Sequence, residues 1–500
     1  MVRTTILTVR QIIESLKNPG DGLAQRAISS GFWVFFLRVV QQLFTLCRLF
    51  ILARILSPND FGLMGIALLT MATLETFSQT GFQTALIQKK ENIEHYLDSA
   101  WTFLILRGFA LFIILYLIAP YAAAFFGAPE AEPIIQVIGV SVLLQAFTNI
   151  GVIYFQKELE FNKQFIYQFA GTLADFIVAV SAVLVLQNVW ALIFGLVTGN
   201  AVRCIISYVV HPYRPHLALD IAKIKELFGF GKWIFWSSIL IFLLTQGDDI
   251  LVGGVLGATA LGLYQMAYMI SNMPATEITH VISQVTFPAY AKMQHNIPKL
   301  REAYLKTLQF TALLSFPIAG IIFVLAPDFT GLFLGEKWLP MVPAMQVLVF
   351  WGLIRSIGAT TGPIFYATGQ PKILTNYQLI QLLMVIILIY PFTECWGILG
   401  TSLAILMASI GANVLASYAV VKITGCEIYS FIRAISLPLA GSLIAVIFIV
   451  LLKICWSTSN APLTSFILTL VSYGSVYFGV ICLFNRVLGY RTQDLVKGVF

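Results

Sequence analysis

Apolar runs long enough to cross a bilayer recur from about residue 30 to about residue 485 of this chain. No polar stretch between two such runs exceeds roughly 25 residues, which is too short for a soluble domain. Hydrophobic residues make up 59% of the sequence and charged residues 11%, which leaves too little polar surface to cover a water-soluble globule. We therefore expect an all-α polytopic membrane protein whose function lies within the membrane region.

Turn residues and charges divide the apolar sequence into about fourteen predicted transmembrane helices. Their approximate ranges are 30–54, 61–86, 99–119, 134–155, 165–187, 189–210, 231–255, 260–288, 303–326, 341–367, 374–391, 396–421, 431–453 and 463–485. Of the 30 lysines and arginines, 22 fall in loops on one side of these spans and 3 on the other. Because cytoplasmic loops carry the excess of positive charge, both termini are predicted to be cytoplasmic.

An internal repeat relates the two halves of the chain. A shift of 200 residues aligns residues 31–63 with residues 231–263, and Gly31, Trp33 and Thr45 then meet identical residues. Six predicted spans separate the copies, and an even number gives both halves the same orientation. We expect two six-helix lobes related by a pseudo-two-fold axis along the membrane normal, followed by two further helices, with substrate bound between the lobes.

The predicted domains follow from this division. They are a cytoplasmic N-terminal segment (1–27), an N-lobe (28–215), a C-lobe (216–421), and a C-terminal helix pair with a cytoplasmic tail (422–500). Apolar residues at helical spacing among Arg3, Arg10 and Lys17 predict that the first segment is an amphipathic helix on the membrane surface. A disordered tail is the alternative.

The first predicted span carries polar side chains on one face. At 100° per residue, five of them fall within about 120° of the helix circumference. They are Arg38, Gln41, Gln42, Thr45 and Arg48. An arginine at a helix centre costs about 2.5–3.5 kcal/mol on insertion scales, so two on one stripe predict a wet cavity or an anionic partner. The alternative for Arg48 is that it extends from the end of the span to the interface.

Arginines in three further spans are candidates for the same cavity. We expect Arg107 and Arg355 to line it, whereas Arg203 lies near the predicted cytoplasmic end of its span, where an interfacial position explains it equally well. A pyrophosphate accepts several bidentate guanidinium contacts, and an organic cation would be repelled. The predicted substrate therefore carries phosphate.

Acidic residues within spans are the predicted gate or coupling groups. The repeat places Asp248 at the position equivalent to Arg48, which predicts an ion pair that a substrate anion or a proton opens, with Asp249 as a neighbour. Glu75 and Asp175 are further intramembrane carboxylates suited to proton coupling. Static structural pairs, ordinary interhelical hydrogen bonds and helix-end charges in water are the alternatives.

Motifs of catalysis and of cofactor binding are missing from the sequence. The six cysteines form no C-x-x-C pair, the five histidines have no metal-binding spacing, and glycine-rich phosphate loops are absent. We predict no catalytic residue, no metal and no cofactor. The net charge of +7 is attributed to loops beside anionic lipid rather than to a nucleic-acid surface.

Two segments resemble a known family. ILARILSPNDFGLMGIA (51–67) and DDILVGGVLGATALGLYQMAYMISNMP (248–274) are similar to the polysaccharide transporter family of the multidrug/oligosaccharidyl-lipid/polysaccharide exporter superfamily, of the colanic-acid, teichuronic-acid and O-antigen exporter type. Residues on the motif positions are Pro58, Asp60, Phe61, Gly62, Asp248, Gly253, Gly257, Gly262 and Tyr264. Gly254 departs from the family, in which a basic residue often follows the first glycine.

The resemblance implies a flippase, not an enzyme, that moves undecaprenyl-pyrophosphate-linked oligosaccharide repeat units across the bacterial inner membrane by alternating access. It serves exopolysaccharide, capsule or O-antigen biosynthesis. Implied partners are the lipid-linked oligosaccharide and membrane lipid, with protons or sodium ions and other polysaccharide-assembly proteins as further candidates.

Three alternatives remain open. A non-transporting scaffold in an assembly complex leaves the intramembrane arginines unexplained. A drug or cation antiporter of the same superfamily requires an acidic cavity. A membrane polysaccharide polymerase or ligase requires catalytic residues on a substantial outer loop, and the longest predicted outer loops, 120–133 and 327–340, are short.

Overall fold

The computed structural model describes residues 23–89, 93–158, 160–455 and 462–488, and this part of the chain contains helices and no strands. The chain divides into two compact units, Met1–Gln246 and Gly247–Phe500. The predicted amphipathic segment lies outside the described residues up to residue 22, as does the tail from residue 489. The predicted domain boundaries at 215/216 and 421/422 remain predictions.

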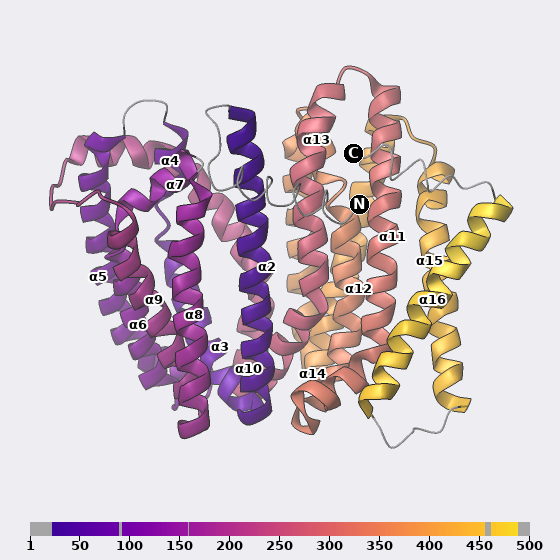
Figure 1. The fold of residues 1–500 in the computed structure, drawn as a ribbon, viewed down its shortest axis with the longest axis horizontal. Coiled ribbons are helices and arrows are strands. Elements are labelled where there is room, and N and C mark those ends of the chain that lie inside the picture. The colour runs from indigo at the N-terminus through magenta and orange to yellow at the C-terminus, as the bar shows by residue number, and fades with distance from the viewer. Residues whose placement is uncertain (1–22, 90–92, 159, 456–461, 489–500) are drawn as a thin grey trace, which may run out of the picture. The chain divides into compact units, whose positions relative to one another are not determined.

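The first unit is a bundle of long helices joined by short helical turns (Figure 1). Its elements are α2 (Leu23–Ile55), α3 (Pro58–Phe77), α4 (Phe82–Gln88), α5 (Glu94–Phe125), α6 (Ala131–Ala146), η1 (Ile150–Val152), α7 (Ile153–Lys157), α8 (Phe161–Leu186), α9 (Trp190–Val210) and the first part of α10 (Ile221–Met293).

The second unit is likewise a helical bundle (Figure 1). It contains the rest of α10, then α11 (Ile297–Phe329), η2 (Thr330–Leu334), η3 (Glu336–Met341), α12 (Val342–Gly358), α13 (Gly362–Ala367), α14 (Pro371–Thr424), α15 (Ile428–Cys455) and α16 (Pro462–Leu488).

Most of these helices have the length and composition of membrane spans. Within the described ranges, 11 helices meet this criterion, or 12 when the bent pair Ala131–Ala146 and Ile150–Lys157 counts as one span. Large apolar side chains lie on their outer faces; Val185 is 81% exposed and Val209 72%. Such surfaces suit lipid rather than water. The prediction of an all-α, multi-pass membrane protein is confirmed, but the count of fourteen spans is not.

The helix α14 folds back on itself. A straight helix of its 54 residues would be about 80 Å long, more than twice the ~30 Å hydrocarbon core. Its helical conformation breaks at Gly397, which has φ 59°. The hydroxyls of Thr393 and Thr401 lie 2.7 Å apart, and Gln381 donates to Ser409 at 3.0 Å. These pairs are nearly symmetric about Gly397, so the two halves are antiparallel, as predicted for 374–391 and 396–421.

The helix α10 reverses in the same way, within the segment that carries the second family motif. Gly257 has φ 81° and ψ −179°, a conformation open essentially to glycine alone. Tyr264 donates to Asp248 at 2.7 Å, and Gln265 donates to Asp249 at 3.2 Å. In this motif, Gly257 allows the chain to reverse, and the hydrogen bond between Tyr264 and Asp248 joins the two sides. The spans predicted at 231–255 and 260–288 therefore form a helical hairpin.

Two other predicted spans are interrupted, and their continuity was predicted wrongly. The predicted span 61–86 ends early, because α3 stops at Phe77 and Gly81 takes a left-handed conformation with φ 68° before α4 begins. The predicted span 134–155 bends by 69° after α6. There the Asn149 side chain accepts from the Gly151 N–H at 2.9 Å and replaces the helical backbone pattern with a turn. The apolar residues of these two segments do not reveal either break.

The first family motif forms the turn between α2 and α3. The Ser57 hydroxyl accepts from the Asp60 N–H at 3.2 Å, and the Asp60 carboxylate accepts from the Ser57 N–H at 2.9 Å, which is a capping box with Pro58 at the first helical position. The second Asp60 oxygen accepts from the Val189 N–H at 3.1 Å, just before α9. The motif thus fixes the end of α2 relative to the α8–α9 pair.

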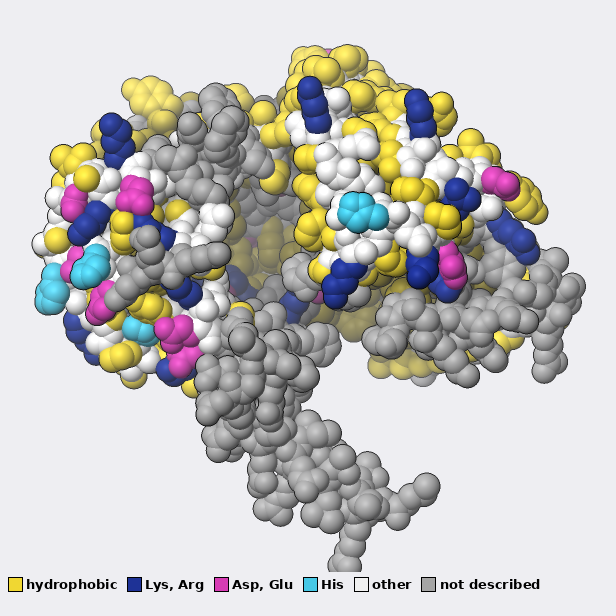
Figure 2. Space-filling model, turned by 90° about the horizontal axis from the view of Figure 1, so that it is seen from above, with side chains coloured by type: hydrophobic (Ala, Val, Ile, Leu, Met, Phe, Trp, Pro, Cys, Tyr) yellow, Lys and Arg dark blue, Asp and Glu magenta, His cyan; other side chains and the backbone are white. Residues whose placement is uncertain are grey.

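Charged side chains lie on the surface of each unit among apolar ones, and Figure 2 shows lysine, arginine, acidic and histidine side chains there. In the first unit, the extended segment after α9 lies across the start of α5. Tyr213 donates to Asp98 at 2.6 Å, and the Ala218 N–H donates to Thr102 at 3.0 Å. The loops predicted to share one side of the membrane therefore meet at one end of this unit.

The C-terminal helix pair docks on α11 around a proline. Pro317 has no N–H to donate to the Leu313 carbonyl. The Tyr477 hydroxyl of α16 donates to that carbonyl at 3.0 Å. Ser442 of α15 donates to the Phe316 carbonyl at 2.9 Å. Side chains of α15 and α16 thus supply hydrogen bonds at the point where the helical pattern of α11 is interrupted.

Candidate functional site

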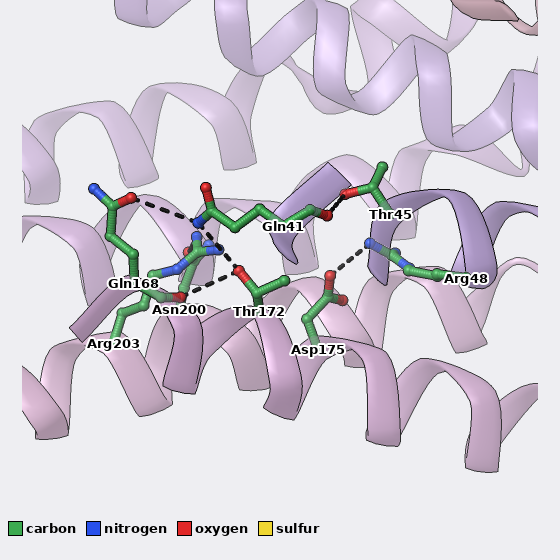
Figure 3. Close-up of polar contacts among 8 residues, drawn as sticks. All are labelled: Gln41, Thr45, Arg48, Gln168, Thr172, Asp175, Asn200 and Arg203. Atoms are coloured by element: carbon green, nitrogen blue, oxygen red, sulfur yellow. Dashed lines mark hydrogen bonds and ion pairs between the residues drawn. The ribbon is translucent and has the colours of Figure 1, made fainter. Parts of the chain in front are cut away.

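The polar face of α2 lies against α8. Aromatic rings hold the two helices together on one side of this contact: Phe44 packs edge-on against Phe169 and Phe176, with ring centroids 5.6 and 5.2 Å apart. Beside this apolar seam, polar side chains of α2 meet polar side chains of α8 (Figure 3). The packing of α2 against α8 therefore places the polar face of α2 inside the first unit.

An ion pair lies at one end of this polar contact. Arg48 Nη1 lies 2.6 Å from Asp175 Oδ2, and the two side chains are 22% and 17% exposed. Arg48 Nε and Asp175 Oδ1 are buried and have no hydrogen-bond partner within the described part of the chain. Each charged group thus keeps one atom that could still form a hydrogen bond. A buried ion pair is most stable when all such atoms are hydrogen-bonded.

A second contact lies two helical turns away. Gln41 Nε2 lies 3.5 Å from both Gln168 Oε1 and Thr172 Oγ1. Gln41 and Arg48 are seven residues apart on α2, as are Gln168 and Asp175 on α8. Seven residues return a side chain to nearly the same face of a helix. The result is a polar ladder between α2 and α8 (Figure 3).

Glycines in α9 allow this helix to pack closely against Asp175 of α8. A Cβ added to Gly195 would lie 2.5 Å from Asp175 Oδ1, and one added to Gly199 would lie 2.9 Å from Asp175 Cβ. Glycines four residues apart let membrane helices approach closely. The α8–α9 contact therefore fixes the Asp175 carboxylate against the backbone of α9 and directs it to α2.

Two polar residues of α9 complete the cluster. Arg203 Nη1 donates to Asn200 Oδ1 at 3.2 Å, and the Arg203 side chain lies over Gly171 of α8, one turn from Asp175. Asn200 is 3% exposed, and its amide nitrogen has no partner among the residues described. Arg203 thus belongs to the cluster, although its sequence position fitted an interfacial role equally well.

The structure brings together three of the predicted site residues. Gln41 and Arg48 of α2 contact α8, where Arg48 meets Asp175, whereas the Thr45 hydroxyl donates to the Gln41 carbonyl of its own helix at 2.8 Å. Arg38 and Gln42 lie farther round α2 from the α8 contact and are both partly exposed. Sequence reasoning missed the α8 partners Gln168 and Thr172 and the α9 partner Asn200. Gln168, Thr172 and Asp175 share one helical face, a signal that the sequence does contain.

Glu75 and Arg107 line a separate cavity of ≈ 420 Å³ in the same unit. Arg107 donates to the Ser78 carbonyl at 2.9 Å and to the Glu75 carbonyl at 3.1 Å, and thereby caps the end of α3. Gln79 and Gln83 line this cavity as well. They do so because the chain turns at residues 78–81, rather than by helical spacing.

The remaining predicted residues lie in the second unit. Asp248 is 6% exposed and is bonded to Tyr264, while Asp249 is bonded to Gln265. Arg355 lies 5.6 Å from the Trp351 ring centre and 3.5 Å from the Thr276 hydroxyl. Arg48 and Asp248 thus each bond within their own unit, and their pairing with each other remains a prediction.

Sequence comparisons agree on one family of proteins. A family model described as "Polysaccharide biosynthesis protein" matches residues 51–343. The chain is 27% identical over 428 residues to the lipopolysaccharide biosynthesis protein WzxC of Escherichia coli (strain K12), covering 84% of this chain and 86% of that protein. It is 25% identical over 332 residues to the succinoglycan biosynthesis transport protein ExoT of Rhizobium meliloti (strain 1021), covering 66% of this chain and 67% of that one.

A solved structure shows the same fold. The inward closed conformation of the lipid II flippase MurJ matches with a TM-score of 0.74, over 93% of this chain and 100% of that chain, at 16% sequence identity. At this identity the likeness establishes the fold alone.

Proposed function

Because the chain belongs to the polysaccharide biosynthesis protein family, we propose that it is a flippase for undecaprenyl-pyrophosphate-linked oligosaccharide repeat units. It moves them across the bacterial inner membrane for exopolysaccharide, capsule or O-antigen assembly, and it performs no covalent chemistry on them. The names of WzxC and ExoT support a role in polysaccharide export, and the resemblance noted in the two sequence motifs is confirmed.

The observation that carries the proposal is the ion pair of Arg48 and Asp175 with its unfilled hydrogen-bonding groups. A guanidinium engaged through one nitrogen retains other donors for a second anion. A pyrophosphate binds such a group more strongly than a single carboxylate does, because it carries more charge and more acceptor oxygens. An organic cation would have to displace Arg48 from Asp175 and would then be repelled by the guanidinium beside it, which argues against the drug antiporter.

Binding and release follow from competition for Arg48. Substrate pyrophosphate takes the guanidinium, and Asp175 is left without its partner. A carboxylate freed in a half-buried site gains stability by taking up a proton. Asp175 thereby couples substrate binding to protonation. When Asp175 loses this proton to water, its carboxylate pairs with Arg48 again and displaces the substrate.

The other intramembrane charges have supporting roles in this proposal. Arg38 and Arg355 extend the basic lining, and Asp248, Asp249 and Glu75 are further sites for a coupling proton or sodium ion. The lobes rock about the bound substrate to expose it to each side in turn. The excess of basic residues in the loops on one side of the predicted spans supports cytoplasmic termini.

Complementation of a flippase-deficient bacterial strain tests the proposal. Wild-type protein restores glycan export, whereas Arg48→Ala and Asp175→Asn lose it at equal protein level in the membrane. Lys225→Ala, an exposed charge change in α10, is the matched control and exports normally. Full export by Arg48→Ala, or no export by the wild type, contradicts the proposal.

A further inference from the structure

We infer that the first unit contains a binding subsite for a neutral sugar residue, in the cavity beside α3 and α4. This inference rests on the proposed flippase function and names where the glycan part of its substrate is held. The cavity measures ≈ 420 Å³, within the range of small-molecule sites. Its polar wall is formed chiefly by Glu75, Gln79, Thr80, Gln83, Arg107 and Gln145.

Three amides in this wall are available to a ligand. Gln79, Gln83 and Gln145 come from the turn after α3, from α4 and from α6, and all three are exposed. Their side chains make no hydrogen bond to any residue that the structure describes. Amides on a lipid-facing surface would be costly. Their convergence on one cavity provides both donors and acceptors, which is the combination that sugar hydroxyls require.

The charges of the cavity disfavour an ionic ligand. Arg107 donates through Nε and Nη2 to the end of α3, so much of its hydrogen-bonding capacity is committed to the protein. Glu75 lines the same space and repels a phosphate, while the nearby guanidinium repels a cation. A neutral, hydroxyl-rich ligand avoids both repulsions.

A second cavity extends the site. It measures ≈ 230 Å³ and shares Phe82, Gln83, Leu104 and Gln145 with the first. Phe82 and Leu104 provide an apolar wall, which suits the C–H face of a sugar ring. Two adjoining compartments with common walls fit two successive residues of an oligosaccharide.

Saturation-transfer NMR with free lactose and cellobiose tests the subsite on the purified full-length protein. We expect sugar signals from the wild type and their loss in the triple variant Gln79→Leu, Gln83→Leu, Gln145→Leu. Gln136→Leu makes the same change on α6 outside both cavities and keeps the signals. Absence of signals from the wild type, or their retention in the triple variant, overturns the inference.

A second arm separates this inference from the proposed function. Arg48→Ala keeps the disaccharide signals, because it lies outside both cavities, but loses glycan export in cells. The triple variant binds undecaprenyl pyrophosphate without sugar as the wild type does, and binds the oligosaccharide-bearing lipid at least about tenfold more weakly. Equal weakening for both lipids overturns the subsite. Disaccharide binding without any export by the wild type retains the subsite and contradicts the flippase.

Discussion

The pair of Arg48 and Asp175 shows how single residues accommodate charge within this membrane unit. A charged side chain in a span is costly, and the structure reduces that cost by placing an acid on α8 opposite the base on α2. Gly195 and Gly199 hold the acid in place from behind. In the function proposed above, the unfilled groups on both partners would allow a substrate anion to replace Asp175.

The coupling between these two residues is measurable by a double-mutant cycle on unfolding of the purified protein. Removing one partner of a buried pair costs about 3–5 kcal/mol, and the partial exposure of both side chains places our expectation near 3 kcal/mol. Arg48→Leu combined with Asp175→Leu should cost clearly less than the sum of the two single changes. Additive costs would show that the two side chains do not interact.

A charge swap distinguishes this pair from the one that the repeat predicts. Arg48→Asp with Asp175→Arg should recover stability lost in either single variant, because the ion pair is re-formed in reverse. Arg48→Asp with Asp248→Arg is the comparison variant. Recovery by the second swap and not by the first would favour the pairing of Arg48 with Asp248.

At this scale the sequence predicts one side of the site better than the other. The stripe of Gln41, Thr45 and Arg48 follows from helical periodicity alone. The partner of Arg48 does not, because pseudo-symmetry proposes Asp248 whereas local packing brings Asp175 to it. Which face of α8 meets α2 depends on the contact of α8 with α9, and a single sequence does not contain that information.

Helical elements in this protein depend on side chains that replace missing backbone bonds. In α11, Pro327 removes the donor to the Phe323 carbonyl, and Gln346 of α12 donates to that carbonyl at 2.9 Å. Tyr477 of α16 does the same for the carbonyl freed by Pro317. At each proline, a side chain of a neighbouring helix therefore binds the carbonyl that lacks its backbone donor.

Removing the tyrosine hydroxyl tests this docking. Tyr477→Phe should lower the free energy of unfolding by about 1 kcal/mol, in the range of interhelical hydrogen bonds in membranes. Pro317→Ala restores the N–H partner of Leu313, so the same change should cost little in that background. Tyr429→Phe, at an exposed tyrosine, is the control. An equal cost of Tyr477→Phe in both backgrounds contradicts the role assigned to the proline.

The segment after α9 should detach as the pH falls. His211 Nδ1 accepts from the Tyr213 N–H at 3.1 Å, and its ring stacks on Tyr154. Burial, and then Lys163, hold the pKa of His211 below its usual 6.5, with Glu160 opposing and Arg214 adding to this effect. The folded form thus prefers the neutral ring, and its stabilisation, complete above pH 6.5, is lost as the pH falls through the lowered pKa.

Hydrogen exchange of residues 212–220 at pH 7.5 and pH 5.5, corrected for intrinsic rates, measures this effect. We expect faster corrected exchange at the lower pH in the wild type and a much smaller change in His211→Gln. His216→Gln, in the same segment, should behave as the wild type. No pH dependence in the wild type would contradict the assignment.

Element boundaries show where sequence reasoning stops. The reversals at Gly257 and Gly397 were predicted, because charges, prolines and glycines interrupt the apolar runs there. The breaks at Gly81 and Asn149 were not, because the polar residues there, 78–81 and 148–149, form only short runs between apolar segments. These two breaks line the two cavities beside α3 and α4, so the sequence did not predict either cavity.

The whole molecule combines an apolar, multi-pass helical fold with polar sites inside its first unit. Composition predicts the membrane class, and charge distribution among loops predicts the orientation. The family match and the fold shared with a lipid II flippase structure agree with that class. The basic stripe of α2 supports a phosphate-bearing substrate, and the cavity beside α3 and α4 is proposed to bind its sugar.

The most direct test is translocation of a fluorescent undecaprenyl-pyrophosphate-linked oligosaccharide in proteoliposomes that contain the purified protein. A charge-assisted hydrogen bond is worth about 1.5–3 kcal/mol, so Arg38→Ala with Arg48→Ala should slow translocation at least about tenfold. Lys225→Ala should leave the rate unchanged. The account is contradicted if the double arginine variant, correctly folded, translocates the lipid at the wild-type rate.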